Sequence, residues 1–163
     1  MHTAYILLGG NIGDRKQHLE NAKQHILFYC GTITQQSSIY QTAAWGVTDQ
    51  PDFYNQVIVI DTLLAPEALM QSLLKIEQIM GRVRSQKMGP RIIDLDILLI
   101  DDLIMETDIL SLPHPAMTKR RFVLEPLSEI SPNKIHPVEK KSIALLLLEC
   151  RDDLNVQKIY TKH

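Results

Sequence analysis

The chain has 163 residues, of which 45% are hydrophobic and 22% are charged, a composition typical of one globular domain. Its formal net charge of −2 provides no general attraction for nucleic acid or an anionic membrane. We therefore expect a single domain over residues 1–163 with no nucleic-acid partner, and any anion-binding site must be local.

The first third of the chain predicts a strand, a helix and a second strand. A strand over 3–8 leads to Gly9, Gly10 and Gly13, which we interpret as a tight turn because neither GxxxxGK[ST] nor GxGxxG is present. Asp14 can cap a helix that ends before Gly31. The side chains expected on its buried side are Leu19, Ala22, Ile26 and Tyr29. A strand over residues 37–41 follows.

The middle of the chain continues this alternation. Residues 53–62 predict a strand, and Pro66 begins a helix that Gly81 ends. The apolar run over 92–100 predicts a central strand covered on both faces. Strand, helix, two strands, helix and strand is the order of an α+β fold with a ferredoxin-like antiparallel sheet and helices on one face.

The last third predicts a small C-terminal extension. We expect a hairpin around Leu103, proline-containing loops and a closing helix over residues 142–150, with no prediction for the tail after Arg151. Cys30 and Cys150 form no CxxC motif, which favours reduced thiols in a cytoplasmic protein. The sequence shows no signal-peptide pattern and no apolar run of membrane-spanning length, so we expect no membrane partner.

Two carboxylates, Asp94 and Asp96, interrupt the apolar run. Because strand side chains alternate, both should share a face with Ile92 and Leu98. The opposite face is expected to carry Ile93, Leu95, Ile97 and Leu99. Two neighbouring anions in a partly desolvated place need a cation, and oxygen ligands without Cys or His suit Mg²⁺. For this motif alone, an equally good alternative is pairing with Arg91 or a nearby lysine.

The segment before these carboxylates carries more positive charge than they require. Arg82, Arg84 and Arg91 lie close together, with Lys87 between them. A polyphosphate carries several negative charges and binds arginine bidentately. It would therefore account for both the metal-like carboxylates and the surplus cations.

Phe53 and Asn55 lie on one face of the strand predicted over 53–62. A flat bicycle with an amide-like edge could stack on the ring and be recognised by the amide. For these two residues alone, a half-buried strand start with Phe53 in the core is the favoured alternative.

Several motifs, taken together, are similar to those of a known family. They occur in the family's order at Gly9-Gly-Asn-Ile-Gly13, Ser38-Ile-Tyr-Gln-Thr42, Asp49-Gln-Pro-Asp-Phe-Tyr-Asn55, Glu77, Gly81-Arg-Val-Arg84, Gly89-Pro-Arg-Ile-Ile-Asp-Leu-Asp96, Pro113-His-Pro115 and Arg120-Arg-Phe122. The set resembles the 6-hydroxymethyl-7,8-dihydropterin pyrophosphokinase family of folate biosynthesis. Any one of these motifs would be weak evidence, but the whole set is hard to obtain by chance.

This resemblance implies an ATP-dependent and Mg²⁺-dependent monomeric enzyme that converts ATP and the hydroxymethyl-dihydropterin into AMP and the pterin diphosphate. The residues implied in catalysis are Arg82, Arg91, Asp94 and Asp96, of which the two aspartates would hold two Mg²⁺ ions. Those implied in ATP binding are Glu77, Arg82, Arg84, Arg91, Ile97, Ser111, His114 and Arg120, with Arg121 as the alternative to Arg120. Those implied in pterin binding are Thr42, Trp45, Phe53, Asn55, Asp94 and Phe122.

Two other classes of protein share parts of this pattern. A metal-dependent phosphohydrolase or nuclease would also use Asp-x-Asp with arginines, but would not require Phe53, Asn55 and Phe122 around a flat ring. A ferredoxin-like RNA-binding module would share the fold, yet should show RNP-type aromatics and a basic surface. A zinc enzyme is disfavoured because the histidines form no HExxH or Cys-paired pattern.

Overall fold

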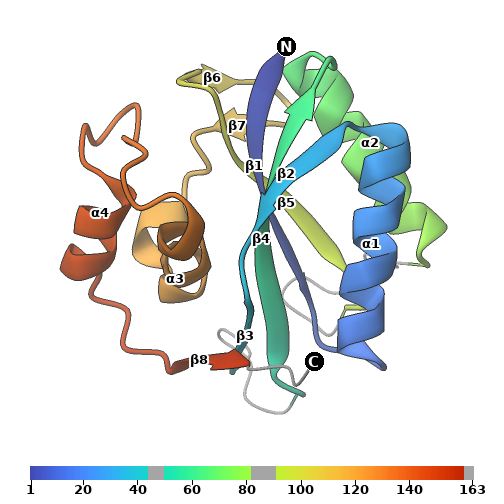
Figure 1. Ribbon diagram of the computed structural model, residues 1–163, viewed down its shortest axis with the longest axis horizontal. Coiled ribbons are helices and arrows are strands. Elements are labelled where there is room, and N and C mark those ends of the chain that lie inside the picture. Colours follow the sequence, from blue (N-terminus) through green and yellow to red (C-terminus); the bar gives the residue numbers. More distant parts are fainter. Residues whose placement is uncertain (44–49, 82–90, 160–163) are drawn as a thin grey trace.

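The computed structural model describes residues 1–43, 50–81 and 91–159 (Figure 1). Within these residues an antiparallel sheet has the strand order β5-β1-β4-β3-β8, and β2 also pairs with β4. Its strands are β1 (His2–Gly10), β2 (Thr32–Gln36), β3 (Ile39–Thr42), β4 (Phe53–Thr62), β5 (Asp94–Ile100) and β8 (Val156–Ile159). The order of β5, β1, β4 and the edge formed by β2 and β3 is that of a ferredoxin-like sheet, as predicted.

Helices cover both faces of this sheet (Figure 1). On one face lie α1 (Arg15–Tyr29) and α2 (Pro66–Ile79), and on the other lie α3 (Arg121–Ile130) and α4 (Ile143–Glu149). A short 3₁₀ helix, η1 (Met117–Lys119), precedes α3, and β6 (Met105–Glu106) pairs with β7 (Ser111–Leu112). The prediction that helices lie on one face only is therefore wrong.

The second helical layer exists because α3 forms where the sequence predicted a proline-containing loop. Pro126 lies inside α3 and removes only one backbone donor from it. The side chains of Val123, Leu124 and Leu127 are buried against Leu7 and Val57 of the sheet. Burial of this apolar stripe outweighs the local cost of one proline.

The first helical layer follows the sequence closely. The Asp14 side chain accepts a hydrogen bond from the Gln17 backbone N–H (3.1 Å) and caps α1, and Pro66 begins α2. The expected core residues of α1 are buried except Tyr29, which is 40% exposed. Lys23 is buried instead, because its ammonium group donates to Gln36 Oε1 (3.0 Å) and pairs with Glu20 (2.6 Å). The predicted end of α2 near Gly81 is confirmed.

β5 lies at one end of the sheet, so the prediction of a central strand is wrong. It is still covered on both faces by the two helical layers, and its pairing with β1 contains a bulge. Tyr5 pairs with Leu99, whereas Ile6 pairs with Ile97, so Leu98 is an extra residue. Leu98 and Leu99 consequently both face α3, and the expected alternation fails at Leu99. Ile92 precedes the strand and packs with the α1 and α2 core, contrary to the prediction.

Gly9 and Gly10 belong to β1 and do not form the predicted turn. A Cβ atom on Gly10 would lie 2.2 Å from the carbonyl oxygen of Ile92, so the glycine permits two backbones to approach closely. Gly13, with φ of +68°, is the glycine that turns the chain into α1.

The remaining differences lie outside the core. The strand expected at 37–41 begins later, and residues 32–36 form a strand that was not predicted. The tail adds β8 to β3. Cys30 and Cys150 are free thiols, and burial raises the pKa of Cys30 to about 11. No helix among the described residues has the length and apolar character needed to cross a bilayer.

Candidate active site

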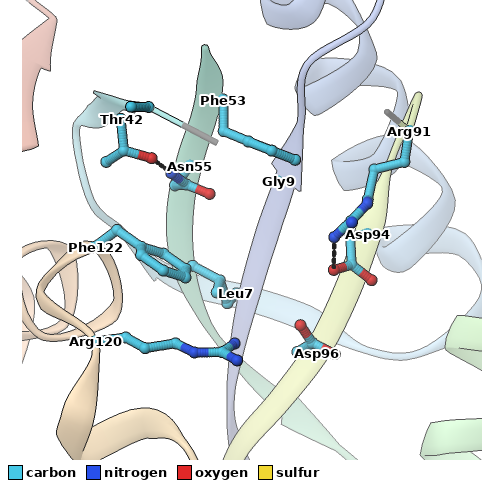
Figure 2. A pocket seen from close by; sticks show the side chains of 11 residues that line it. Leu7, Gly9, Thr42, Phe53, Asn55, Arg91, Asp94, Asp96, Arg120 and Phe122 are labelled. Carbon is cyan, nitrogen blue, oxygen red and sulfur yellow. Dashed lines mark hydrogen bonds and ion pairs between the residues drawn. The ribbon is translucent and has the colours of Figure 1, made fainter. Parts of the chain in front are cut away.

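Two adjoining pockets share Asp96 of β5 in their walls, and the first of them lies at the α3 side of the sheet. The first is lined by Leu7, Gly9, Thr42, Ala43, Phe53, Asn55, Arg91, Asp94, Asp96, Arg120 and Phe122 (Figure 2). The second is lined by Met70, Leu74, Asp96, Ile97, Thr107, Asp108, Ile109, Leu110, Ser111, His114 and Pro115. Most predicted site residues among the described ones thus line one of these two adjoining pockets.

The first pocket presents a buried amide between two aromatic side chains. Asn55 is 3% exposed, and its Nδ2 donates to Thr42 Oγ1 (3.1 Å). Phe53 from β4 and Phe122 from the start of α3 lie to either side of Asn55 (Figure 2). Such a pocket can bind a flat ring whose edge carries donors and acceptors.

Gly9 makes room for this amide. It pairs with Asn55 across β1 and β4, and a Cβ atom on it would lie 2.8 Å from Asn55 Oδ1. A larger residue at position 9 would therefore displace the Asn55 side chain from its present orientation.

The polar wall of the first pocket contains both carboxylates and two arginines. Asp94 and Asp96 project from β5 toward the α3 side, because Leu95 between them packs into the opposite core. Arg91 Nη1 lies 3.3 Å from Asp94 Oδ2, so the ion pair that was an alternative from sequence does form. Arg120 from the α3 layer enters the same pocket, and thus more than one cation faces the carboxylates.

The aromatic rings are also close to these cations. The guanidinium carbon of Arg91 lies 5.2 Å from the centre of the Phe53 ring, and that of Arg120 lies 5.8 Å from the centre of the Phe122 ring. Cations at these distances over ring faces are attracted electrostatically. The planar and the anionic portions of a bound molecule would consequently be held side by side.

Arg121, the alternative to Arg120, has other partners. Its guanidinium donates to the carbonyl oxygens of Asp152 (2.9 Å) and Cys150 (3.1 Å), and it pairs with Glu125. These contacts direct Arg121 toward the C-terminal segment, whereas Arg120 lines the pocket. The geometry favours Arg120 as the pocket cation.

Glu77 is placed differently from the predicted nucleotide contact. Its side chain is 2% exposed, and Oε2 accepts a hydrogen bond from the backbone N–H of Leu95 (2.8 Å). It lines neither of the two pockets. A buried carboxylate in this position fixes the residue that lies between Asp94 and Asp96.

His114 lines the second pocket, and its backbone contacts the bulge residue of β5. Its backbone N–H donates to the carbonyl oxygen of Leu98 (2.9 Å), and its Nδ1 accepts from the Ala116 backbone N–H (3.2 Å). Burial lowers the pKa of the imidazole, the Arg120 charge lowers it further, and Asp94 opposes these effects. His114 therefore lies in the neutral form at neutral pH.

This pKa shift predicts a contribution to the pH dependence of stability. The unfolded chain binds a proton at His114 more readily, so the contribution is present in full above the ordinary pKa of 6.5. It declines as the pH falls and is lost below the lowered pKa of the folded state. We expect His114→Asn to lose less unfolding free energy than the parent protein between pH 7 and pH 5. Urea titrations across this range measure it, and identical pH profiles would contradict it.

Several residues that line the second pocket were not predicted from the sequence. Met70, Thr107, Asp108, Ile109 and Leu110 line the second pocket. They belong to α2 and the β6–β7 hairpin, and no motif marks them in the sequence. Arg82, Arg84 and Trp45 lie outside the described residues.

A family model and two bacterial relatives that match the sequence all carry the name of a pyrophosphokinase. A sequence model of the 7,8-dihydro-6-hydroxymethylpterin-pyrophosphokinase (HPPK) family matches residues 5–132. The chain is 40% identical over 143 residues to the 2-amino-4-hydroxy-6-hydroxymethyldihydropteridine pyrophosphokinase of Aquifex aeolicus, covering 88% of this chain and 89% of that protein. It is 46% identical over 133 residues to the Bacillus subtilis pyrophosphokinase of the same name, with coverage of 79% and 78%.

Solved structures support the same fold. A crystal structure of an HPPK-DHPS protein in complex with substrates superimposes with a TM-score of 0.75 at 17% identity, which is evidence for the fold alone. The match covers 91% of this chain but only 43% of that one, so this chain spans less than half the length of that protein. The extent of the family match and the identity to the bacterial relatives show that the chain belongs to the 7,8-dihydro-6-hydroxymethylpterin-pyrophosphokinase family.

Proposed function

We propose that the chain transfers the pyrophosphoryl group of ATP to the hydroxymethyl group of 6-hydroxymethyl-7,8-dihydropterin. The hydroxyl oxygen forms a bond to the β-phosphorus, and the bond from that phosphorus to the oxygen of the α-phosphate breaks. AMP leaves, the hydroxyl proton is released to solvent, and the pterin diphosphate remains. The observation that carries this proposal is that Asp96 lines both pockets, since transfer between two bound substrates requires one border between them.

The first pocket has the features that a pterin requires. Phe53 and Phe122 would stack on the two faces of the bicycle, and the buried amide of Asn55 would hydrogen-bond its edge, supported by Thr42. A phosphohydrolase or nuclease needs no such pocket, so these residues favour the pterin.

The second pocket is suited to the nucleotide. Ile97, Ser111 and His114 line it, and the charges of Arg120 and Asp94 in the first pocket affect the pKa of His114. Arg91 and Arg120 face the border from the first pocket and would bind phosphate oxygens. We extend the same phosphate-binding role to Arg82 and Arg84, and a pterin contact to Trp45, from the resemblance alone.

The donor set at the border fits magnesium. Asp94 and Asp96 supply hard oxygen atoms, and within the described ranges no group of three or more His, Cys, Asp or Glu is arranged to bind a metal. Mg²⁺ commonly keeps several waters and takes further ligands from phosphates, so two carboxylates suffice. When bound, the ion supplies charge neutralisation at the phosphates. Asp94 and Asp96 would hold it, and Arg91 would balance the remaining charge.

Product analysis tests this function. Incubation of the full chain with ATP, Mg²⁺ and 6-hydroxymethyl-7,8-dihydropterin should form AMP in step with pterin consumption. Formation of ADP, or of AMP without the pterin, would instead indicate a kinase of another type or a hydrolase. We also propose that residues 1–163 act as one monomeric domain, and sedimentation of the active protein measures this.

Gly9→Ala should weaken pterin binding selectively. The new Cβ atom would lie within 2.8 Å of Asn55 Oδ1 and displace the amide that reads the pterin edge. We expect the dissociation constant for the pterin to rise about tenfold or more, the effect of losing one hydrogen bond to a buried group. The affinity for an ATP analogue should change little. Calorimetric titrations with each ligand measure this, and equal losses for the two ligands would contradict it.

A further inference from the structure

Asn11 lies directly after β1 and is 1% exposed. Its Nδ2 donates to Gln50 Oε1 (2.7 Å) and to the carbonyl oxygen of Pro51 (2.9 Å). Its Oδ1 accepts from the backbone N–H of Arg91 (2.9 Å), and its own backbone N–H donates to the Arg91 carbonyl (3.0 Å). One buried amide therefore joins two segments that are far apart in the sequence.

Each of these segments leads into the first pocket. Gln50 and Pro51 precede Phe53 at the start of β4, and Arg91 precedes Asp94 at the start of β5. The guanidinium carbon of Arg91 lies 5.2 Å from the centre of the Phe53 ring, and Arg91 Nη1 lies 3.3 Å from Asp94 Oδ2. Asn11 itself does not line either of the two pockets.

The chemistry of the contacts requires an amide at this position. Two of the partners are acceptors that face Nδ2, and the third is a donor that faces Oδ1. An aspartate would direct a second anionic oxygen at two acceptors, and an apolar residue would remove all three side-chain hydrogen bonds. Gly10 adds to this arrangement, because its missing Cβ lets the backbone of Ile92 approach β1.

We infer that Asn11 is a positioning residue for the transfer reaction, which sets the Arg91 cation relative to the Phe53 ring. This inference rests on the proposed function for its effect on rate, and on the hydrogen bonds alone for its effect on Arg91. The pterin would stack on Phe53 and the phosphates would bind Arg91, so their relative placement sets the distance between the reacting atoms. A displacement of about 1 Å in such a geometry lowers a rate about 100-fold.

A double-mutant cycle distinguishes positioning from a structural role. We expect Asn11→Ala to lower the single-turnover rate about 100-fold in the parent protein. In an Arg91→Ala background the same change should have an effect at least about tenfold smaller, because the guanidinium group that Asn11 positions is absent. The exposed Asn21→Ala is the matched control and should leave the rate unchanged. Additive rate losses for Asn11→Ala and Arg91→Ala would overturn the inference.

Amide hydrogen exchange provides a second readout that does not depend on activity. The Arg91 N–H donates to a buried oxygen of Asn11, so Asn11→Ala should speed its exchange about tenfold or more. The Leu95 N–H, which donates to Glu77, should keep its protection and thereby show that the fold is intact. Retained protection at Arg91 would overturn the inference.

A second variant and the exchange experiment test the inference if Asn11→Ala does not fold or the parent protein is inactive. If Asn11→Ala does not fold, Gln50→Ala removes one of the three side-chain hydrogen bonds and should give a smaller loss that again shrinks in the Arg91→Ala background. If the parent protein forms no AMP, the proposed function fails. The exchange experiment then still decides whether Asn11 holds Arg91.

Discussion

Asp96→Asn is expected to lower the single-turnover transfer rate about 1,000-fold. Asp96 lines both pockets and would hold Mg²⁺ at the border where the phosphates meet the pterin hydroxyl. An amide keeps the shape of the side chain but removes the charge and reduces its affinity for a hard cation. Rapid-quench measurement of AMP formation at saturating substrates gives this rate.

The fold of Asp96→Asn should remain intact. Asp94 and Asp96 are like charges on the same face of β5, so removal of one charge also relieves their repulsion. Thermal unfolding should therefore show an unchanged or slightly raised midpoint. The exposed Asp153→Asn is the matched control for the loss of a carboxylate. Near-normal transfer by Asp96→Asn would refute the assignment of Asp96 to the metal.

Arg91→Ala is the second change with a large expected effect. We expect kcat to fall about 100-fold to 1,000-fold, while the affinity for an ATP analogue falls less than about tenfold. Arg91 lies close to both Asp94 and the Phe53 ring in the first pocket, so its cation can act on the charge that would develop there during transfer. Interactions that strengthen in the transition state affect kcat more than ground-state binding.

Arg120→Ala provides the contrast for this prediction. Arg120 comes from the α3 layer and lies over the Phe122 ring, and we expect it to hold phosphates in the ground state. Its removal should weaken binding of the ATP analogue more than it lowers kcat. Arg151→Ala, at an exposed position, controls for the loss of a positive charge. Equal losses of rate and affinity in Arg91→Ala would show that Arg91 acts mainly in binding.

Several features of this protein could be predicted from its sequence because they depend on residues that are close together in the chain. The Asp14 cap and the Pro66 start of α2 depend on neighbouring residues, and both were predicted. Asp94 and Asp96 were recognisable because carboxylates conflict with an apolar strand. Phe53 and Asn55 share a face through the period of a strand, and both line the first pocket.

The tertiary structure decided how these features combine. The α3 helix, which brings Arg120 and Phe122 to the pocket, forms despite Pro126 because distant parts of the sheet bury its apolar stripe. The bulge at Leu98, which gives His114 its backbone contact, depends on pairing between strands far apart in the sequence.

The partners of the buried polar residues that support the pocket were also decided by the tertiary structure. Asn11 and Glu77 matched family motifs, yet their partners include backbone groups at Arg91 and Leu95, to which the sequence gives no local signal. Burial raises the cost of leaving such polar groups unpaired, and burial is a property of the packed chain. The sequence by itself therefore determined most of the elements and the chemical groups of the site, whereas long-range packing decided the remaining elements and which groups face one another.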